Sequence, residues 1–145
     1  MSKQYNSVEF AKRYADVSRE LGGGLVVVSG GGALLMLGLR QTTGDLDLDV
    51  PEATYRKHRT ADNTELFGVT EIVNYSEDVS LHVLNPFRAT RVVKGVRIYS
   101  VPELIAQKKV LMAHPERKPN KIAQDQADLK ALEALLPHGY VRTGV

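Results

Sequence analysis

The stretch SGGGALLMLGLRQTTGDLDLD, residues 29–49, decides the fold of this chain. It joins a glycine-rich turn to a short apolar segment and then to three alternating aspartates. Asp45, Asp47 and Asp49 are spaced by two residues, the period of a β-strand, so we expect all three to project from one face. Three carboxylates on one face repel each other unless cations lie between them. The pattern therefore favours a site for a divalent metal.

Four small residues form the turn that precedes the aspartates. They connect residues 25–28, which we predict to be a buried strand, to residues 33–39, which we predict to be a helix. Glycines at such a junction let backbone N–H groups approach a phosphate closely. The alternative is a tight turn that needs positive φ and binds nothing. The residues concerned are Ser29, Gly30, Gly31 and Gly32.

Two better-known phosphate motifs do not fit this turn. Leu35 stands where a dinucleotide fingerprint would have its third glycine, and no Gly-Lys-Ser/Thr follows as in a Walker loop. The turn is therefore interpreted together with the acidic strand and not as a motif of its own.

Composition excludes several classes of protein. The chain has 145 residues, 25% charged and 43% hydrophobic, which is typical of one compact soluble domain over residues 1–145. No apolar run approaches the ~20 residues of a membrane span, and the N-terminus lacks the apolar core of a secretory signal. Cysteine is absent, which excludes disulfides and thiolate chemistry. We expect cytoplasmic residence and no membrane partner.

Periodicity predicts an α/β (α+β) chain with a mixed sheet packed with helices. Ser7 is expected to cap the first helix, residues 62–67 are expected to be helix or loop, and residues 137–145 to be loosely held. Further helices are expected at residues 7–21, 52–58, 102–114 and 121–136, and further strands at 45–50, 71–75, 78–84, 91–93 and 96–99.

The same stretch resembles the motif of a known group. Gly30-Gly31-x-Ala33, Gly38-x-Arg40, Thr42-Thr43 and Asp45-x-Asp47 are similar to the motif of the DNA-polymerase-β-like nucleotidyltransferase superfamily. The similarity is closest to small bacterial nucleotidyltransferases of abortive-infection and toxin–antitoxin systems. Leu104-Ile105-Ala106-x-Lys108 and the segment from Lys121 through Asp125-x-x-Asp128-Leu129 resemble two later helices of those proteins. The resemblance covers about residues 25–50 and 96–136.

The resemblance implies a nucleotidyltransferase-like fold and transfer of a nucleotidyl group from a nucleoside triphosphate, ATP among them, by a two-metal mechanism. Asp45 and Asp47 would hold Mg²⁺ or Mn²⁺, with Asp49 in reserve. The turn residues 29–32 would bind the β- and γ-phosphates. Arg40 and Lys108 are further phosphate candidates, with a salt bridge and plain solvation as their respective alternatives. Thr42 and Thr43 would hydrogen-bond the strand or metal-bound waters, with turn chemistry as the alternative.

The third carboxylate of the superfamily has no direct counterpart. The matching strand, residues 79–84, places His82 where an acid is expected, with Ser80 as the fallback and Asp78 as the nearest acid. His82 could serve as ligand or general base, since a neutral imidazole does either. Alternatively, Asp49 or Asp78 could supply the oxygen.

The acceptor hydroxyl could belong to RNA, protein or a small molecule. The basic stretch at residues 117–121 could follow an RNA backbone or be a solvated loop. Two other functions remain: a catalytically degenerate module that binds a nucleotide or a partner protein, and an unrelated α/β protein whose acids hold a structural ion.

Overall fold

The structure is a computed structural model that describes residues 3–137. It divides into two compact units, one ending at Tyr99 and the other beginning at Ser100. That the whole chain forms one domain stays a prediction, and most of the predicted loose tail lies outside the described residues. Within residues 3–137 no helix has the length and apolar character to cross a membrane.

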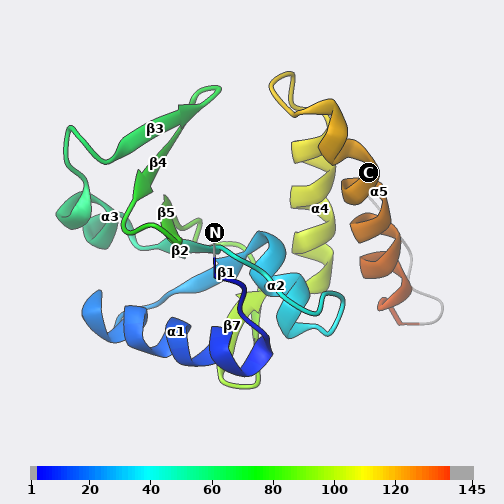
Figure 1. The fold of residues 1–145 in the computed structure, drawn as a ribbon, viewed down its shortest axis with the longest axis horizontal. Helices are drawn as coiled ribbons and strands as arrows, with labels where there is room; N and C mark the ends of the chain where they lie inside the picture. Colours follow the sequence, from blue (N-terminus) through cyan, green and yellow to red (C-terminus); the bar gives the residue numbers. More distant parts are fainter. Residues whose placement is uncertain (1–2, 138–145) are drawn as a thin grey trace. The chain divides into compact units, whose positions relative to one another are not determined.

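A mixed sheet forms the first unit, and its seven strands in the described residues run in the order β3-β4-β5-β2-β1-β7-β6 (Figure 1). The pairs β1–β7 and β2–β5 are parallel, and all other neighbours are antiparallel. The strands are β1 (Val27–Ser29), β2 (Leu46–Val50), β3 (Thr64–Phe67), β4 (Thr70–Asn74), β5 (Val79–Val83), β6 (Thr90–Val93) and β7 (Val96–Tyr99).

The helices of this unit are α1 (Ser7–Glu20), α2 (Gly30–Met36) and α3 (Glu52–His58). The prediction that Ser7 caps α1 is wrong, because the preceding Asn6 is the cap. Its side chain accepts a hydrogen bond from the Glu9 N–H at 2.9 Å, and the Glu9 carboxylate accepts one from the Asn6 N–H at 3.0 Å. This reciprocal capping box satisfies two N–H groups that the helix itself cannot.

The strand alternation in β2 separates an apolar face from an acidic face. Leu46, Leu48 and Val50 are fully buried, whereas the aspartates between them are only partly covered. α1 and α2 pack together on the sheet: the ring of Phe10 lies so close to Gly32 of α2 that a Cβ there would meet it at 2.4 Å. The core therefore fixes one face of β2 and leaves the other for chemistry.

One predicted element was of the wrong type. Residues 64–67 are the strand β3 and not a helix or loop, because they pair in register with β4 through a turn at Gly68, where φ is +62°. Helix α2 also begins at Gly30, three residues before the predicted start, so the glycines of the turn form its first turn.

The second unit consists, in its described residues, of helices α4 (Val101–Met112) and α5 (Pro119–Ala134). Both have a proline in their first turn. N–H groups in a first turn have no hydrogen-bond partner within the helix, so a proline, which lacks the N–H, is tolerated there. For this reason α5 starts two residues earlier than predicted.

Candidate functional site

The glycine turn and the acidic strand lie against each other in the first unit. β1 is antiparallel to β2, and the register sets Ser29 opposite Asp47. Gly30 follows with φ of +63°, a conformation that favours glycine. A Cβ at Gly30 would lie 2.9 Å from Oδ2 of Asp47, closer than real side chains come. The absence of a side chain at Gly30 therefore lets the Asp47 carboxylate sit directly beside the turn.

Arg40 and Thr43 flank the next residue of the turn. A Cβ at Gly31 would lie 2.7 Å from Nη1 of Arg40 and 3.1 Å from Oγ1 of Thr43. Thr43 is itself buried, and its backbone pairs with Tyr5. The structure thus brings a guanidinium and a hydroxyl to the turn. Gly32 has a different role, since it makes room for Phe10 in the core.

The carboxylate of Asp47 has one oxygen fixed by β5. The parallel pairing of β2 and β5 sets Asp47 opposite Ser80, and the Ser80 hydroxyl donates to Oδ1 of Asp47 at 2.7 Å. Oδ2 is the oxygen that faces Gly30. Asp45, just before β2, is exposed. The residue opposite Asp47 on β5 is therefore a neutral serine and not a third carboxylate.

Asp49 lies deeper on the same face and has its own partner. The Tyr99 hydroxyl donates a hydrogen bond to Oδ2 of Asp49. Burial raises the pKa of Asp49 above its ordinary value, and the Tyr99 hydrogen bond together with the charges of His82 and Arg88 opposes that rise. The strand register places His82 opposite Asp49 and not opposite Asp47.

Asp78, the nearest acid to β5, forms its hydrogen bonds with the N-terminal segment, α1 and Ser76. Its carboxylate accepts hydrogen bonds from Arg13 Nε at 3.0 Å, from the Tyr5 hydroxyl at 2.7 Å and from the Ser76 hydroxyl at 2.8 Å. Burial alone would raise the pKa of Asp78, but these hydrogen bonds outweigh it and hold the pKa well below its usual range. Asp78 therefore fastens the start of β5 to the N-terminal segment.

The carboxylates near the turn decide whether this unit could hold a metal ion. Within residues 3–137 no three His, Asp or Glu side chains gather to hold an ion by themselves. Asp45 and Asp47 are hard oxygen donors, and Mg²⁺ is commonly held by one or two carboxylates together with substrate phosphates. Two carboxylates of this kind would suit an ion whose other ligands come from a bound nucleotide; within residues 3–137 they are not part of a site made of protein ligands alone.

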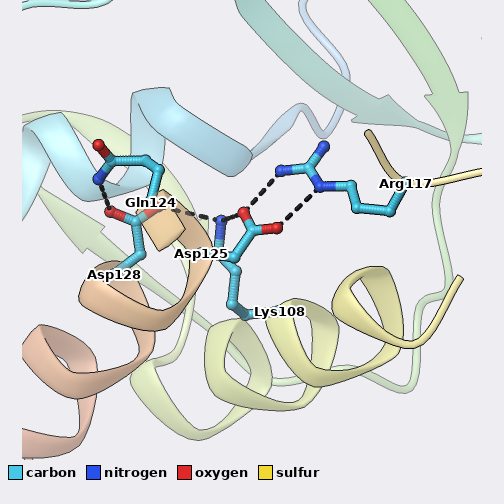
Figure 2. Close-up of polar contacts among 5 residues, drawn as sticks. All are labelled: Lys108, Arg117, Gln124, Asp125 and Asp128. Carbon is cyan, nitrogen blue, oxygen red and sulfur yellow. Dashed lines mark hydrogen bonds and ion pairs between the residues drawn. The ribbon is translucent and has the colours of Figure 1, made fainter. Parts of the chain in front are cut away.

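Lys108, the remaining phosphate candidate, belongs to the second unit (Figure 2). Its Nζ lies 3.3 Å from Oδ1 of Asp125 and 3.2 Å from Oδ2 of Asp128, and its side chain is 11% exposed. Arg117 donates two hydrogen bonds to Asp125, which lowers the pKa of that carboxyl. Gln124 donates to Asp128 at 2.7 Å. The ammonium group thus joins α4 to two aspartates of α5.

Sequence reasoning missed Tyr99 and underrated Ser80. Tyr99 lies at the end of a short apolar strand, where an aromatic residue signals only a buried position. Ser80 ranks only as a fallback by sequence because strand register is set by long-range pairing, and a slip by two residues exchanges it with His82.

Comparisons with known proteins bear on the fold. No protein-family model matches the chain, and no curated protein matches its sequence. A nucleotidyltransferase-like antigenic protein from Paracoccidioides brasiliensis is similar in structure, with a TM-score of 0.54, 16% identity and coverage of 92% of this chain and 79% of that one. JHP933 from Helicobacter pylori is similar with a TM-score of 0.54, 18% identity and coverage of 88% and 67%.

These similarities confirm a nucleotidyltransferase-like fold, which is the class predicted from the motif. At such low identities they concern the fold alone. They leave activity, substrate and metal open to proposal.

Proposed function

We propose that this chain transfers a nucleotidyl group from a nucleoside triphosphate to a hydroxyl acceptor, with Mg²⁺ or Mn²⁺ bound. The observation that carries the proposal is the surroundings of the turn. Oδ2 of Asp47 abuts Gly30, and Nη1 of Arg40 abuts Gly31. An anionic group that can hold a metal and a cation that can hold a phosphate therefore lie at consecutive positions of one turn.

In this proposal the turn holds the triphosphate. Backbone N–H groups of Ser29, Gly30, Gly31 and Gly32 would donate to phosphate oxygens. Arg40 would add charge-assisted hydrogen bonds, and Thr43 a hydroxyl donor. Lys108 stays a phosphate candidate only if nucleotide binding draws it from Asp125 and Asp128, so we rank it below Arg40.

The acidic strand holds the metal. Asp45 and Asp47 would be its ligands, with Asp49 in reserve because Tyr99 already occupies one of its oxygens. The ion would supply positive charge that neutralises the triphosphate and the departing pyrophosphate. Ser80 would orient Asp47 through its hydrogen bond.

The reaction needs a proton acceptor beside the acceptor hydroxyl. The acceptor oxygen forms a bond to the α-phosphorus, the bond from that phosphorus to the pyrophosphate oxygen breaks, and the hydroxyl proton leaves. His82 is the candidate base, since it follows Ser80 by two residues on the same face of β5. The acceptor would be RNA, protein or a small molecule. The resemblance to toxin–antitoxin and phage-defence enzymes favours a cytoplasmic role with a partner protein.

Label transfer tests the proposal. The protein is incubated with each α-³²P nucleoside triphosphate, ATP first, in Mg²⁺ or Mn²⁺ with RNA, protein and small-molecule acceptors, and transfer and pyrophosphate are measured. We expect Asp47→Asn to lose about a hundredfold or more of the activity, because it removes the charge that holds the metal. Asp62→Asn is the matched control, since Asp62 lies exposed in a turn before β3. Equal activity in Asp47→Asn and Asp62→Asn would contradict the proposal.

The neutral hydroxyl opposite Asp47 favours a second candidate, a degenerate module that binds a nucleotide or a partner without transferring anything. Such a module would bind a nucleoside triphosphate in calorimetry with Mg²⁺ present, and Asp47→Asn would weaken that binding. It would release no pyrophosphate with any acceptor.

A further inference from the structure

A strongly basic segment follows β5 and continues through the outer strand β6 into β7. Residues 85–97 contain four cations and no acid, and no Asp or Glu occurs between Asp78 and Glu103. The net charge of the whole chain is only +2, so this segment concentrates positive charge locally. We name residues 87–97 the basic segment. Its cations are Arg88, Arg91, Lys94 and Arg97.

The segment begins with an aromatic side chain held out in solvent. Oδ1 of Asn85 accepts a hydrogen bond from the Phe87 N–H at 3.0 Å, and the Asn85 carbonyl accepts one from the Arg88 N–H at 3.2 Å. The turn is therefore fixed, and the Phe87 side chain is 95% exposed on it. A phenyl ring exposed on a hydrogen-bonded turn presents a stacking surface.

Two of the cations lie near the acidic strand. In β7, Arg97 precedes Tyr99 by two residues and so shares its face, and the Tyr99 hydroxyl bonds to Asp49. The charge of Arg88 also acts on the Asp49 carboxylate. Val92, which pairs with Arg97, is 54% exposed, so this face is open to solvent at β6.

The other two cations extend the positive charge to the edge of the sheet. β6 is the last strand in the sheet order, and Arg91 lies exposed on it. Lys94 lies in the hairpin turn with φ of +52°. At the opposite end of the sheet the outer strand β3 carries Glu65. An anionic polymer is therefore attracted to the β6 end.

From these observations we infer that the basic segment binds a single-stranded nucleic acid, whose end is the acceptor for the reaction at Asp47. The part of the inference that makes the nucleic-acid end the acceptor rests on the proposed function. Arginines bind backbone phosphates, and an exposed aromatic ring stacks on an unpaired base of any sequence. Arg97 lies on the face of the sheet that carries Asp49, and Arg88 adjoins Phe87 in sequence, so one segment offers both contacts. An acidic peptide would use the charge but leave the phenyl ring without a planar partner.

The test measures binding of a fluorescein-labelled 12-nucleotide single-stranded RNA by anisotropy over a range of salt. We expect Phe87→Ala to weaken binding about tenfold, the effect of losing one stacked base. Arg88→Glu and Arg97→Glu should each weaken binding further and reduce the slope of log affinity against log salt by about 0.7 per lost phosphate contact. Lys12→Glu on α1 is the charge-matched control, because Lys12 is exposed on a different element.

Two further arms define the ligand. Single-stranded DNA of the same sequence should bind too, since it offers the same phosphates and unpaired bases. An RNA duplex should bind more weakly than the single strand, since paired bases cannot stack on Phe87. Equal binding of duplex and single strand, or equal effects of Lys12→Glu and Arg88→Glu, would overturn the inference.

Failure of this inference is distinguishable from failure of the proposed function. A fluorescent nucleoside triphosphate with Mn²⁺ is titrated in parallel, with circular dichroism confirming that each variant is folded. Binding of the triphosphate without binding of RNA would overturn the inference alone. Binding of RNA that depends on Phe87, without binding of the triphosphate, would overturn the proposed function and leave the basic segment as a binding surface.

Discussion

At the scale of single residues, the site depends on where a side chain is missing. Gly30 supplies a φ of +63° and lets Oδ2 of Asp47 approach the turn, while Ser80 holds Oδ1. The orientation of Asp47 is thus set from both sides, which is the kind of pre-organisation that a metal ligand needs. A change at Gly30 should therefore affect the binding of metal and nucleotide as well as folding.

Gly30→Ala is the variant that tests this. The alanine must adopt a left-handed conformation, which costs about 1–2 kcal/mol, and its Cβ must displace the Asp47 carboxylate from 2.9 Å. We expect a loss of about 2 kcal/mol in the free energy of unfolding and at least a tenfold loss in affinity for Mn²⁺ and nucleotide. Urea denaturation and calorimetry measure the two.

Gly38→Ala is the matched control for that variant. Gly38 has φ of +80°, but a Cβ there would meet no atom within 4 Å. It should lose about as much stability from backbone strain and keep its affinity for nucleotide. Equal losses of affinity in the two variants would show that strain alone matters and that Asp47 is not held by the turn.

At the scale of elements, the strands and helices with strong local patterns were predictable. The alternation of Leu46, Asp47, Leu48 and Asp49 is enough to specify β2 and its two faces. β3 was not predictable, because its alternation is weak and its pairing depends on a positive φ at Gly68. The partners of Asp49 and Asp47, Tyr99 and Ser80, depend on strand order and register, which one sequence does not determine.

The contact between α4 and α5 allows a prediction at the same scale. Lys108 is nearly buried and neutralises Asp125 and Asp128, so Lys108→Met leaves two buried carboxylates with less positive charge. We expect a loss of about 3 kcal/mol in the free energy of unfolding, typical of removing one partner from a buried ion pair. Urea denaturation followed by circular dichroism measures it.

Nucleotide affinity decides between the two roles of Lys108. A lysine that only joins α4 to α5 leaves the affinity of the folded variant for nucleoside triphosphate unchanged. A lysine that binds phosphate loses affinity tenfold or more in Lys108→Met, and Lys108→Arg recovers part of it. The first outcome would remove Lys108 from the site, and the second would contradict a purely structural role.

At the scale of the whole chain, both units depend on carboxylates that are stabilised in their charged form. Hydrogen bonds from Arg13, Tyr5 and Ser76 outweigh burial and lower the pKa of Asp78, and the Arg117 hydrogen bond lowers that of Asp125. Arg59 and Tyr55 lower the pKa of Glu71 to about 2. Asp49 acts in the opposite sense, because burial raises its pKa.

These directions determine how stability depends on pH. A carboxyl whose pKa is lower in the folded state binds fewer protons there than in the unfolded state, so its stabilisation is complete above the unfolded pKa of about 4. That stabilisation is lost as the pH falls through the lower, folded pKa. We therefore expect the melting temperature to be steady near neutral pH and to fall from about pH 5 towards pH 2.

Asp78→Asn tests which groups carry that dependence. The variant lacks the charge that binds Arg13, so it should be less stable than the wild type at pH 7 and lose less stability between pH 5 and pH 2. The two curves of melting temperature against pH should therefore converge in acid, because protonation removes from the wild type the same interaction that the substitution removes at every pH. Parallel curves would show that the Arg13–Asp78 pair contributes nothing to the acid sensitivity, and that Asp125 and Glu71 account for it.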